Sequence, residues 1–157
     1  MAGSNDNGRK IVASNRRARH NYQILETVEC GIVLTGSEVK SLRQGQVQLK
    51  DGYADFRGNE LWLTSVYIAP YSFARDGGHE PERPRKLLMH KREIERLFAK
   101  VREAGLTLIP LSVYFSHGLA KVELGLAKGR SRIDKRNAIK EREQKREMER
   151  NTGRRRS

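Results

Sequence analysis

The chain has 157 residues and a formal net charge of +13 at pH 7. This length fits one domain, and the positive charge favours a polyanionic partner, most commonly nucleic acid. The single cysteine, Cys30, excludes an internal disulfide framework and a multi-cysteine metal cluster. No apolar stretch is long enough for a membrane span, and the N-terminus lacks an apolar signal core. We expect a basic, soluble, cytoplasmic protein without a membrane partner.

The first third of the chain is rich in strand-forming residues. Residues 1–8 are polar and predict a disordered N-terminus, followed by a short basic run at 9–12. Residues 22–34 favour a strand with a bulge or bend at Gly31, and Cys30 within it is expected to be a small buried hydrophobe. The stretch Thr35-Gly36-Ser37 offers an N-cap for a short helix over 38–43.

The middle of the chain predicts a hairpin, an irregular connection and a helix. Residues 46–49 and 52–56 alternate at period two, and 57–59 turn the chain into a strand over 60–68. Residues 72–86 contain paired glycines and two prolines, which indicates an irregular connection. A helix follows, with an approximate capping box at His90 and Glu93 and a stop at Gly105. Its apolar stripe consists of Ile94, Leu97, Phe98 and Val101.

Two further strand segments, 106–109 and 111–115, lead through a turn at 116–118 into a strand over 120–127. The total is about six short strands, antiparallel where hairpins are visible, with two inserted helices. This pattern predicts a mainly β fold, a small closed or nearly closed antiparallel barrel over residues 9–127.

The C-terminal tail, residues 128–157, carries thirteen Lys and Arg against five Asp and Glu, which is +8 of the total charge. It has too few apolar residues to offset its ordering entropy, so we expect it to be disordered when free. Its composition between 134 and 150 favours helix, which predicts folding upon binding.

No constellation for catalysis is evident. The four histidines lack metal-ligand spacing, and the glycines near the tail do not match a phosphate loop, so no metal and no cofactor are expected. Asp51 and Asp55 could hold Mg²⁺ for phosphodiester cleavage, which leaves a Mg-dependent nuclease as an alternative.

RNA binding is the function that the residues favour. Two basic regions, 16–20 and the tail, accompany tyrosines on or near predicted strands, a combination typical of RNA-binding barrels. The tyrosines are Tyr53, Tyr67, Tyr71 and Tyr114. Core packing is the simpler interpretation of Trp62, Phe98 and Phe115.

Several motifs occur in order along the chain, at residues 15–20, 31–43, 81–88, 90–93, 121–129, 134–136 and 139–143. Together they resemble one family, the bacterial small protein B family of SsrA-binding proteins. The resemblance implies an oligonucleotide-binding-type barrel with embedded helices and no chemistry of its own. It also implies binding to the tRNA-like domain of transfer-messenger RNA, delivery to stalled ribosomes, and tagging of the stalled peptide for degradation.

The resemblance further implies where contacts are made. Carried over by position, RNA-contact residues fall at Asn15, Glu29, Leu88 and Lys121, and the basic run adds Arg16, Arg17, Arg19 and His20. Otherwise Leu88 would be a core residue and Lys121 a solvated charge. An acid such as Glu29 faces RNA favourably only if it accepts hydrogen bonds from base or ribose donors.

In the family the tail becomes helical on the ribosome and enters the empty mRNA channel past the decoding centre. The corresponding residues here are Lys128, Gly129, Arg130, Arg132, Ile133, Asp134, Lys135, Arg136, Lys140 and Arg142. Ile133 stands where many relatives carry His or Tyr, and Ile packs against a base without aromatic stacking. The expected partners also include elongation factor Tu in the delivery complex, with the protein itself a monomer. A structural ribosomal RNA-binding protein remains the second alternative.

Overall fold

The computed structural model describes residues 9–71, 78–129 and 146. Within them the strands are β1 (Arg9–Ser14), β2 (Tyr22–Ile32), β3 (Val47–Gln48), β4 (Tyr53–Arg57), β5 (Glu60–Thr64), β6 (Tyr67–Ile68), β7 (Arg85–Leu88), β8 (Thr107–Ser116) and β9 (Leu119–Gly129). The helices are α1 (Ala18–Asn21), α2 (Gly36–Arg43) and α3 (Lys91–Ala104). No helix in these ranges is long and apolar enough to cross a membrane.

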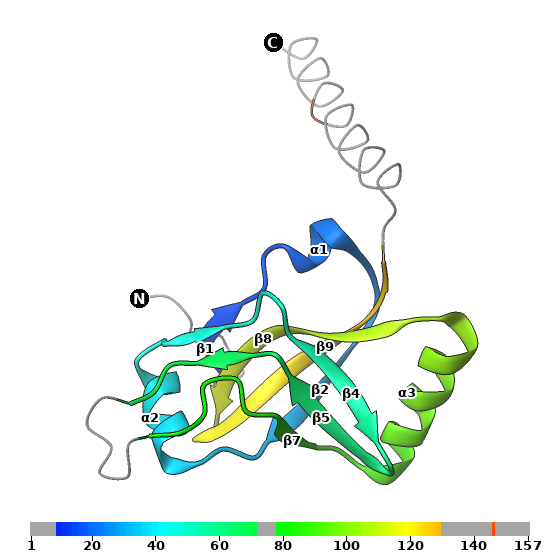
Figure 1. Ribbon diagram of the computed structural model, residues 1–157. Helices are drawn as coiled ribbons and strands as arrows, with labels where there is room; N and C mark the ends of the chain where they lie inside the picture. Colours follow the sequence, from blue (N-terminus) through cyan, green and yellow to red (C-terminus); the bar gives the residue numbers. More distant parts are fainter. Residues whose placement is uncertain (1–8, 72–77, 130–145, 147–157) are drawn as a thin grey trace.

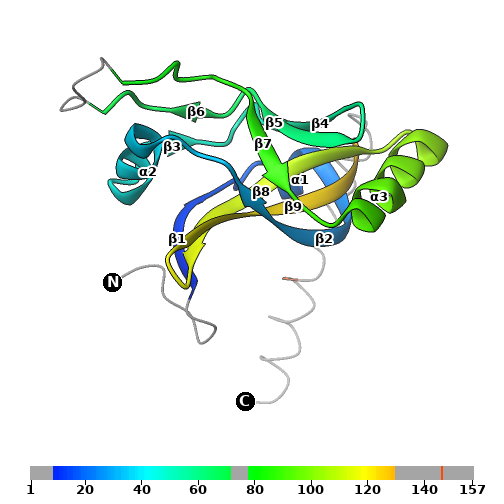
Figure 2. The same cartoon turned by 90° about the horizontal axis from the view of Figure 1, so that it is seen from below.

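Six strands close into a barrel (Figure 1). The order is β8-β4-β5-β7-β2-β9, all antiparallel, and pairing between β9 and β8 completes the ring. β1 pairs with the second half of β8, and β3 and β6 form a small separate ladder. Figure 2 shows α2 and α3 on opposite sides of this barrel. The predicted antiparallel barrel with inserted helices is therefore confirmed.

Register shifts bend the long strands enough to close the barrel. They occur between Ile24 and Glu26 in β2 and between Pro110 and Ser112 in β8. Such bulges increase local twist, and a proline is tolerated at one because it has no N–H to donate to the ladder. The two segments predicted around Pro110 are thus one continuous strand. The bulge expected at Gly31 is wrong, since Gly31 pairs regularly with both Leu88 and Lys121.

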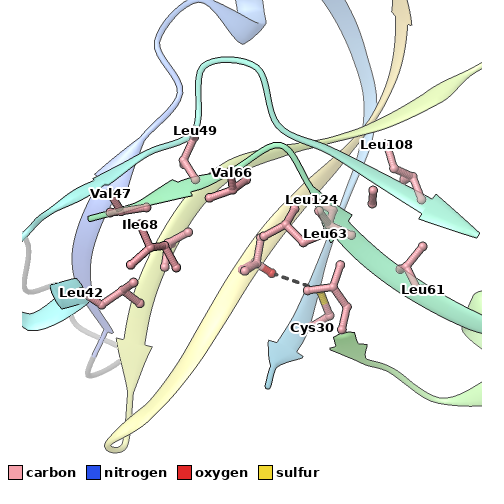
Figure 3. Close-up of a cluster of buried hydrophobic side chains, with 14 of the residues drawn as sticks. Cys30, Leu42, Val47, Leu49, Leu61, Leu63, Val66, Ile68, Leu108 and Leu124 are labelled. Carbon is pink, nitrogen blue, oxygen red and sulfur yellow. Dashed lines mark hydrogen bonds between the residues drawn. The ribbon is translucent and has the colours of Figure 1, made fainter. Parts of the chain in front are cut away.

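The barrel interior is filled by aliphatic side chains from most strands (Figure 3). Cys30 lies among them, 3% exposed, with its Sγ donating to the carbonyl oxygen of Val122 at 3.6 Å. Burial, with a smaller effect of neighbouring Glu29, raises the pKa of the Cys30 thiol to about 12. The prediction of a small buried hydrophobe is confirmed, and Cys30 remains protonated at neutral pH.

A buried ion network joins α2 to β7. The α2 capping box formed by Thr35 and Glu38 is complete, which confirms the predicted N-cap. The Glu38 carboxylate, fully buried, also accepts from Arg85 Nε at 2.5 Å and Arg83 Nη2 at 2.5 Å. Burial alone would raise the pKa of Glu38, but the hydrogen bonds from Arg83, Thr35 and Arg85 outweigh it and lower that pKa. Arg85 itself is fully buried and donates further to the carbonyls of Val66 and Pro81.

Other expected boundaries are wrong. β7 ends the connection predicted as irregular over 72–86, of which residues 72–77 lie outside the described ranges. The predicted strand over 60–68 is broken at Ser65, which has a φ of 61°. These described ranges also contain nine strands, more than the six expected, because β1 and β7 were not predicted and the segment 60–68 is divided into β5 and β6.

The predicted C-terminus of α3 is confirmed, but the capping box predicted at its N-terminus is wrong. Gly105 ends the helix in the left-handed conformation, as expected. His90 makes no side-chain cap, and Glu93 instead pairs with Arg96 at 2.9 Å. Phe98 is 43% exposed and packs edge-on against Phe56, so its expected core position is wrong. Phe115 is buried as expected, and Trp62 is half-buried.

Candidate nucleic-acid interface

Three of the four residues implied by resemblance line one hollow. This β2–β7–β9 hollow, about 540 Å³, is lined by Val28, Glu29, Cys30, Gly31, Leu88, Met89, His90, Glu93 and Lys121. Gly31 pairs with Leu88 on one side and with Lys121 on the other. A Cβ at Gly31 would lie 3.3 Å from Leu88 Cβ, so the glycine lets Leu88 lie close over β2. Strand pairing thus gathers residues far apart in sequence.

Leu88 faces solvent at the rim of this hollow. Its side chain is 53% exposed, which rules out the core position that apolarity alone would suggest. Together with Gly31 it offers an apolar surface against which a base or ribose could pack. Lys121, half-buried on the neighbouring strand, places a cation within the same hollow.

Glu29 is held in place by two donors. Arg9 Nη2 donates to its carboxylate at 3.0 Å, and the hydroxyl of Tyr114 donates to the same oxygen. The Glu29 side chain remains 40% exposed. Since a carboxylate has about four acceptor sites, Glu29 retains the capacity to accept from RNA. Its charge is offset by Arg9, which reduces its repulsion of phosphate.

Tyr114 serves as a buried donor. The residue is 1% exposed, so the expected stacking role on RNA is wrong for this tyrosine. Burial, followed by the hydrogen bond to Glu29, raises the pKa of its hydroxyl well above the ordinary value, so it stays protonated. The guanidinium of Arg9 lies 4.5 Å from the Tyr114 ring centroid. Sequence reasoning missed Arg9 and Tyr114 as supports of Glu29.

The basic run at residues 16–20 lies at one end of the barrel. Arg16, Arg17, Arg19 and His20 are all exposed in the turn before α1 and in α1 itself. The last residue of β9, Gly129, pairs with Tyr22 immediately after α1. The root of the tail therefore lies beside this basic end, as Figure 1 shows.

Asn15 does not join the other three implied residues. Its Nδ2 donates to the carbonyl of Pro110 at 3.1 Å and to that of Leu49 at 3.4 Å. These bonds tie the end of β1 to β8 and to the turn before β4. Asn15 lines a second hollow of about 370 Å³ next to α1, which is named the α1 hollow below.

Of the tail residues named in the sequence analysis, only Lys128 and Gly129, at the end of β9, belong to the described part of the chain. Lys128 and Gly129 are exposed at the end of that strand. The residues from Arg130 to Arg142 named above, and the tail's expected disorder and helix, lie outside the described residues.

The two acids of the alternative nuclease do not form a recognisable metal centre. Asp55 lies 3.5 Å from Arg57, whereas Asp51 lines the α1 hollow. Residues 9–71, 78–129 and 146 contain no group of three or more His, Cys, Asp or Glu side chains placed to hold a metal ion.

A small antiparallel barrel with helices between its strands and a basic end defines a class of nucleic-acid-binding domain. The family model described as "SmpB protein" matches residues 12–154. An SsrA-binding protein of Acidothermus cellulolyticus is 57% identical over 150 residues, covering 96% of this chain and 94% of the relative. One from Anaeromyxobacter dehalogenans is 59% identical over 145 residues, covering 92% and 89%.

A solved structure described as "tmRNA-SmpB: a journey to the center of the bacterial ribosome" has a TM-score of 0.66 and 51% sequence identity. The match covers 81% of this chain and 93% of that one. The chain belongs to the SmpB family.

Proposed function

We propose that this protein binds the tRNA-like domain of transfer-messenger RNA and brings it to stalled ribosomes in trans-translation. The observation that carries the proposal is the convergence of Glu29, Leu88 and Lys121 on one hollow, in a chain whose relatives are SsrA-binding proteins. The hollow combines an apolar surface, a cation and a positioned acceptor. RNA loops with unstacked bases and ribose hydroxyls present the matching groups.

The ribosome is the second partner in this proposal. The tail root and the exposed arginines of the basic end lie together, so one end of the barrel concentrates positive charge toward ribosomal RNA. The tail enters the empty mRNA channel past the decoding centre, with elongation factor Tu in the delivery complex. The protein acts in the cytoplasm as a monomer and contributes binding and positioning without catalysing a reaction.

The role of Glu29 is tested by a charge-matched pair of variants. Glu29→Ala is expected to weaken binding to a tRNA-like-domain transcript by about tenfold to a hundredfold, because a charged acceptor is lost. Glu123→Ala is the control: Glu123 pairs with Glu29 across the strands and lies 3.8 Å from Arg9, but does not line the hollow. Both variants lose one negative charge, which by electrostatics alone strengthens RNA binding.

Affinities are measured by filter binding at fixed salt. A selective loss in Glu29→Ala, with partial recovery in Glu29→Gln, supports the proposal. Equal or tighter binding by both alanine variants would show that Glu29 accepts nothing from this RNA.

A further inference from the structure

The α1 hollow shares no residue with the β2–β7–β9 hollow. It is lined by Asn15, Arg17, Ala18, Asn21, Tyr22, Lys50, Asp51, Gly52, Tyr53, Thr107 and Ile109. These residues come from α1 and the turn before it, from the turn before β4, and from the starts of β2, β4 and β8. Its volume of about 370 Å³ lies within the range usual for pockets that take a small ligand.

The turn that forms one wall of the α1 hollow is held by hydrogen bonds and close packing. The amide of Gly52 donates to Leu49 at 2.9 Å and closes the turn that carries Lys50 and Asp51. A Cβ at Gly52 would lie 2.5 Å from Val66 Cγ2 and 2.9 Å from Pro110 Cγ, so only glycine lets this turn pack down. Asn15 then ties the turn to the end of β1 through Leu49.

Two cations in the hollow are available to phosphate. Arg17 and Lys50 are exposed, and neither side chain has an ion-pair or hydrogen-bond partner among the residues that the structure describes. Tyr53 stands beside them with 42% exposure at the start of β4. An exposed ring next to unpaired cations is the usual arrangement for stacking one base while its phosphate is held.

The remaining charged group of the hollow is Asp51. Its carboxylate is exposed and also has no side-chain partner within 9–71 and 78–129. Guanine is the only RNA base with two adjacent donors, N1–H and the N2 amino group, on its Watson–Crick edge. Two carboxylate oxygens accept both, whereas adenine, cytosine and uracil each place an acceptor next to a donor.

We propose that the α1 hollow is a second RNA subsite that takes one unstacked guanosine of a bound RNA strand. Tyr53 stacks on the base, Asp51 accepts from its Watson–Crick edge, and Arg17 and Lys50 hold the phosphates. Pairing of Tyr22 with Gly129 places this subsite next to the end of β9. This inference rests on the proposed RNA-binding function and adds a base preference to it.

The test uses the full-length ¹⁵N-labelled protein and the ribotrinucleotides UGU, UAU and UCU. UGU is expected to shift the Gly52 amide and the Asn15 and Asn21 side-chain amides, with about tenfold tighter binding than UAU or UCU. Equal binding of the three, or shifts confined to other residues, would overturn the proposal. So would tighter binding of free guanosine 5′-monophosphate than of UGU.

Matched variants separate base selection from fold. Asp51→Asn keeps the size but replaces one acceptor by a donor, so the preference for UGU over UAU is expected to disappear. Asp55→Asn is the control, because Asp55 lies outside the hollow beside Arg57. Retained preference in Asp51→Asn would overturn the assignment. Binding of the tRNA-like domain by the wild-type protein is measured in parallel. Normal binding of this domain without a guanine preference rejects only the subsite. Failure of the wild-type protein to bind any RNA rejects the proposed function.

Discussion

Replacing Arg85 with alanine is expected to lower the free energy of unfolding by about 3–5 kcal/mol, because it strips a fully buried carboxylate of a partner. Arg85 and Glu38 are both 0% exposed, and Arg85 also satisfies the carbonyls of Val66 and Pro81. The loss therefore removes three hydrogen bonds at once, although Glu38 keeps its bonds from Arg83 and Thr35. Urea unfolding followed by circular dichroism measures it.

The neighbouring residue supplies the control. Lys86 pairs with Glu60 at 2.5 Å, the same distance as Arg85 with Glu38, but both partners are more than 40% exposed. Lys86→Ala is expected to cost less than about 1 kcal/mol, since solvent screens exposed pairs. Similar losses in the two variants would show that burial of the Arg85 pair does not determine its contribution.

The pH dependence of this loss has a defined sign. The pKa of Glu38 in the folded protein is lowered from its ordinary value of 4.5. The ionised carboxylate therefore contributes its whole stabilisation above pH 4.5, and this contribution is lost as the pH falls through the folded-state pKa. Arg85→Ala weakens that effect. The difference between wild type and variant should therefore shrink on acidification below pH 4.5.

Deleting residues 130–157 is expected to abolish peptide tagging while the tRNA-like domain stays bound. The β2–β7–β9 hollow lies wholly in the barrel, and the deletion begins after the last residue of β9. Tagging is measured in a reconstituted translation system on a message without a stop codon. Affinity for the tRNA-like domain is measured in parallel over a range of salt concentrations.

Removal of the tail's Lys and Arg residues should flatten the salt dependence of RNA binding, because each phosphate contact releases counterions. At moderate salt the affinity should fall by less than about tenfold. A collapse of affinity there, or tagging at wild-type levels, contradicts the division of labour between barrel and tail.

Local signals predicted the parts of the fold that local contacts build. The β4–β5 and β8–β9 hairpins were predictable because the turns contain Gly58 and Gly118, both with positive φ. β7 was not predictable, since its partners are β5 and β2 and one of its four residues is a buried arginine. An arginine is usually a surface residue, and the burial of Arg85 depends on Glu38, 47 positions away, and on the carbonyls of Val66 and Pro81.

The candidate site likewise contains residues that could be predicted from the sequence and others that could not. Resemblance placed Glu29, Leu88 and Lys121, and strand pairing brings them together. The groups that orient Glu29 are 20 and 85 residues distant in sequence, so no local pattern could identify them. The α1 hollow depends on a turn, a helix start and a strand start that meet only in the folded barrel.

RNA that co-purifies with the full-length protein after a high-salt wash tests the proposed function most directly. Sequencing is expected to show strong enrichment of transfer-messenger RNA over ribosomal RNA, and Glu29→Ala should reduce that enrichment more than Glu123→Ala does. Ribosomal RNA alone in the wild-type sample would contradict the proposal and favour a protein docked permanently on the ribosome.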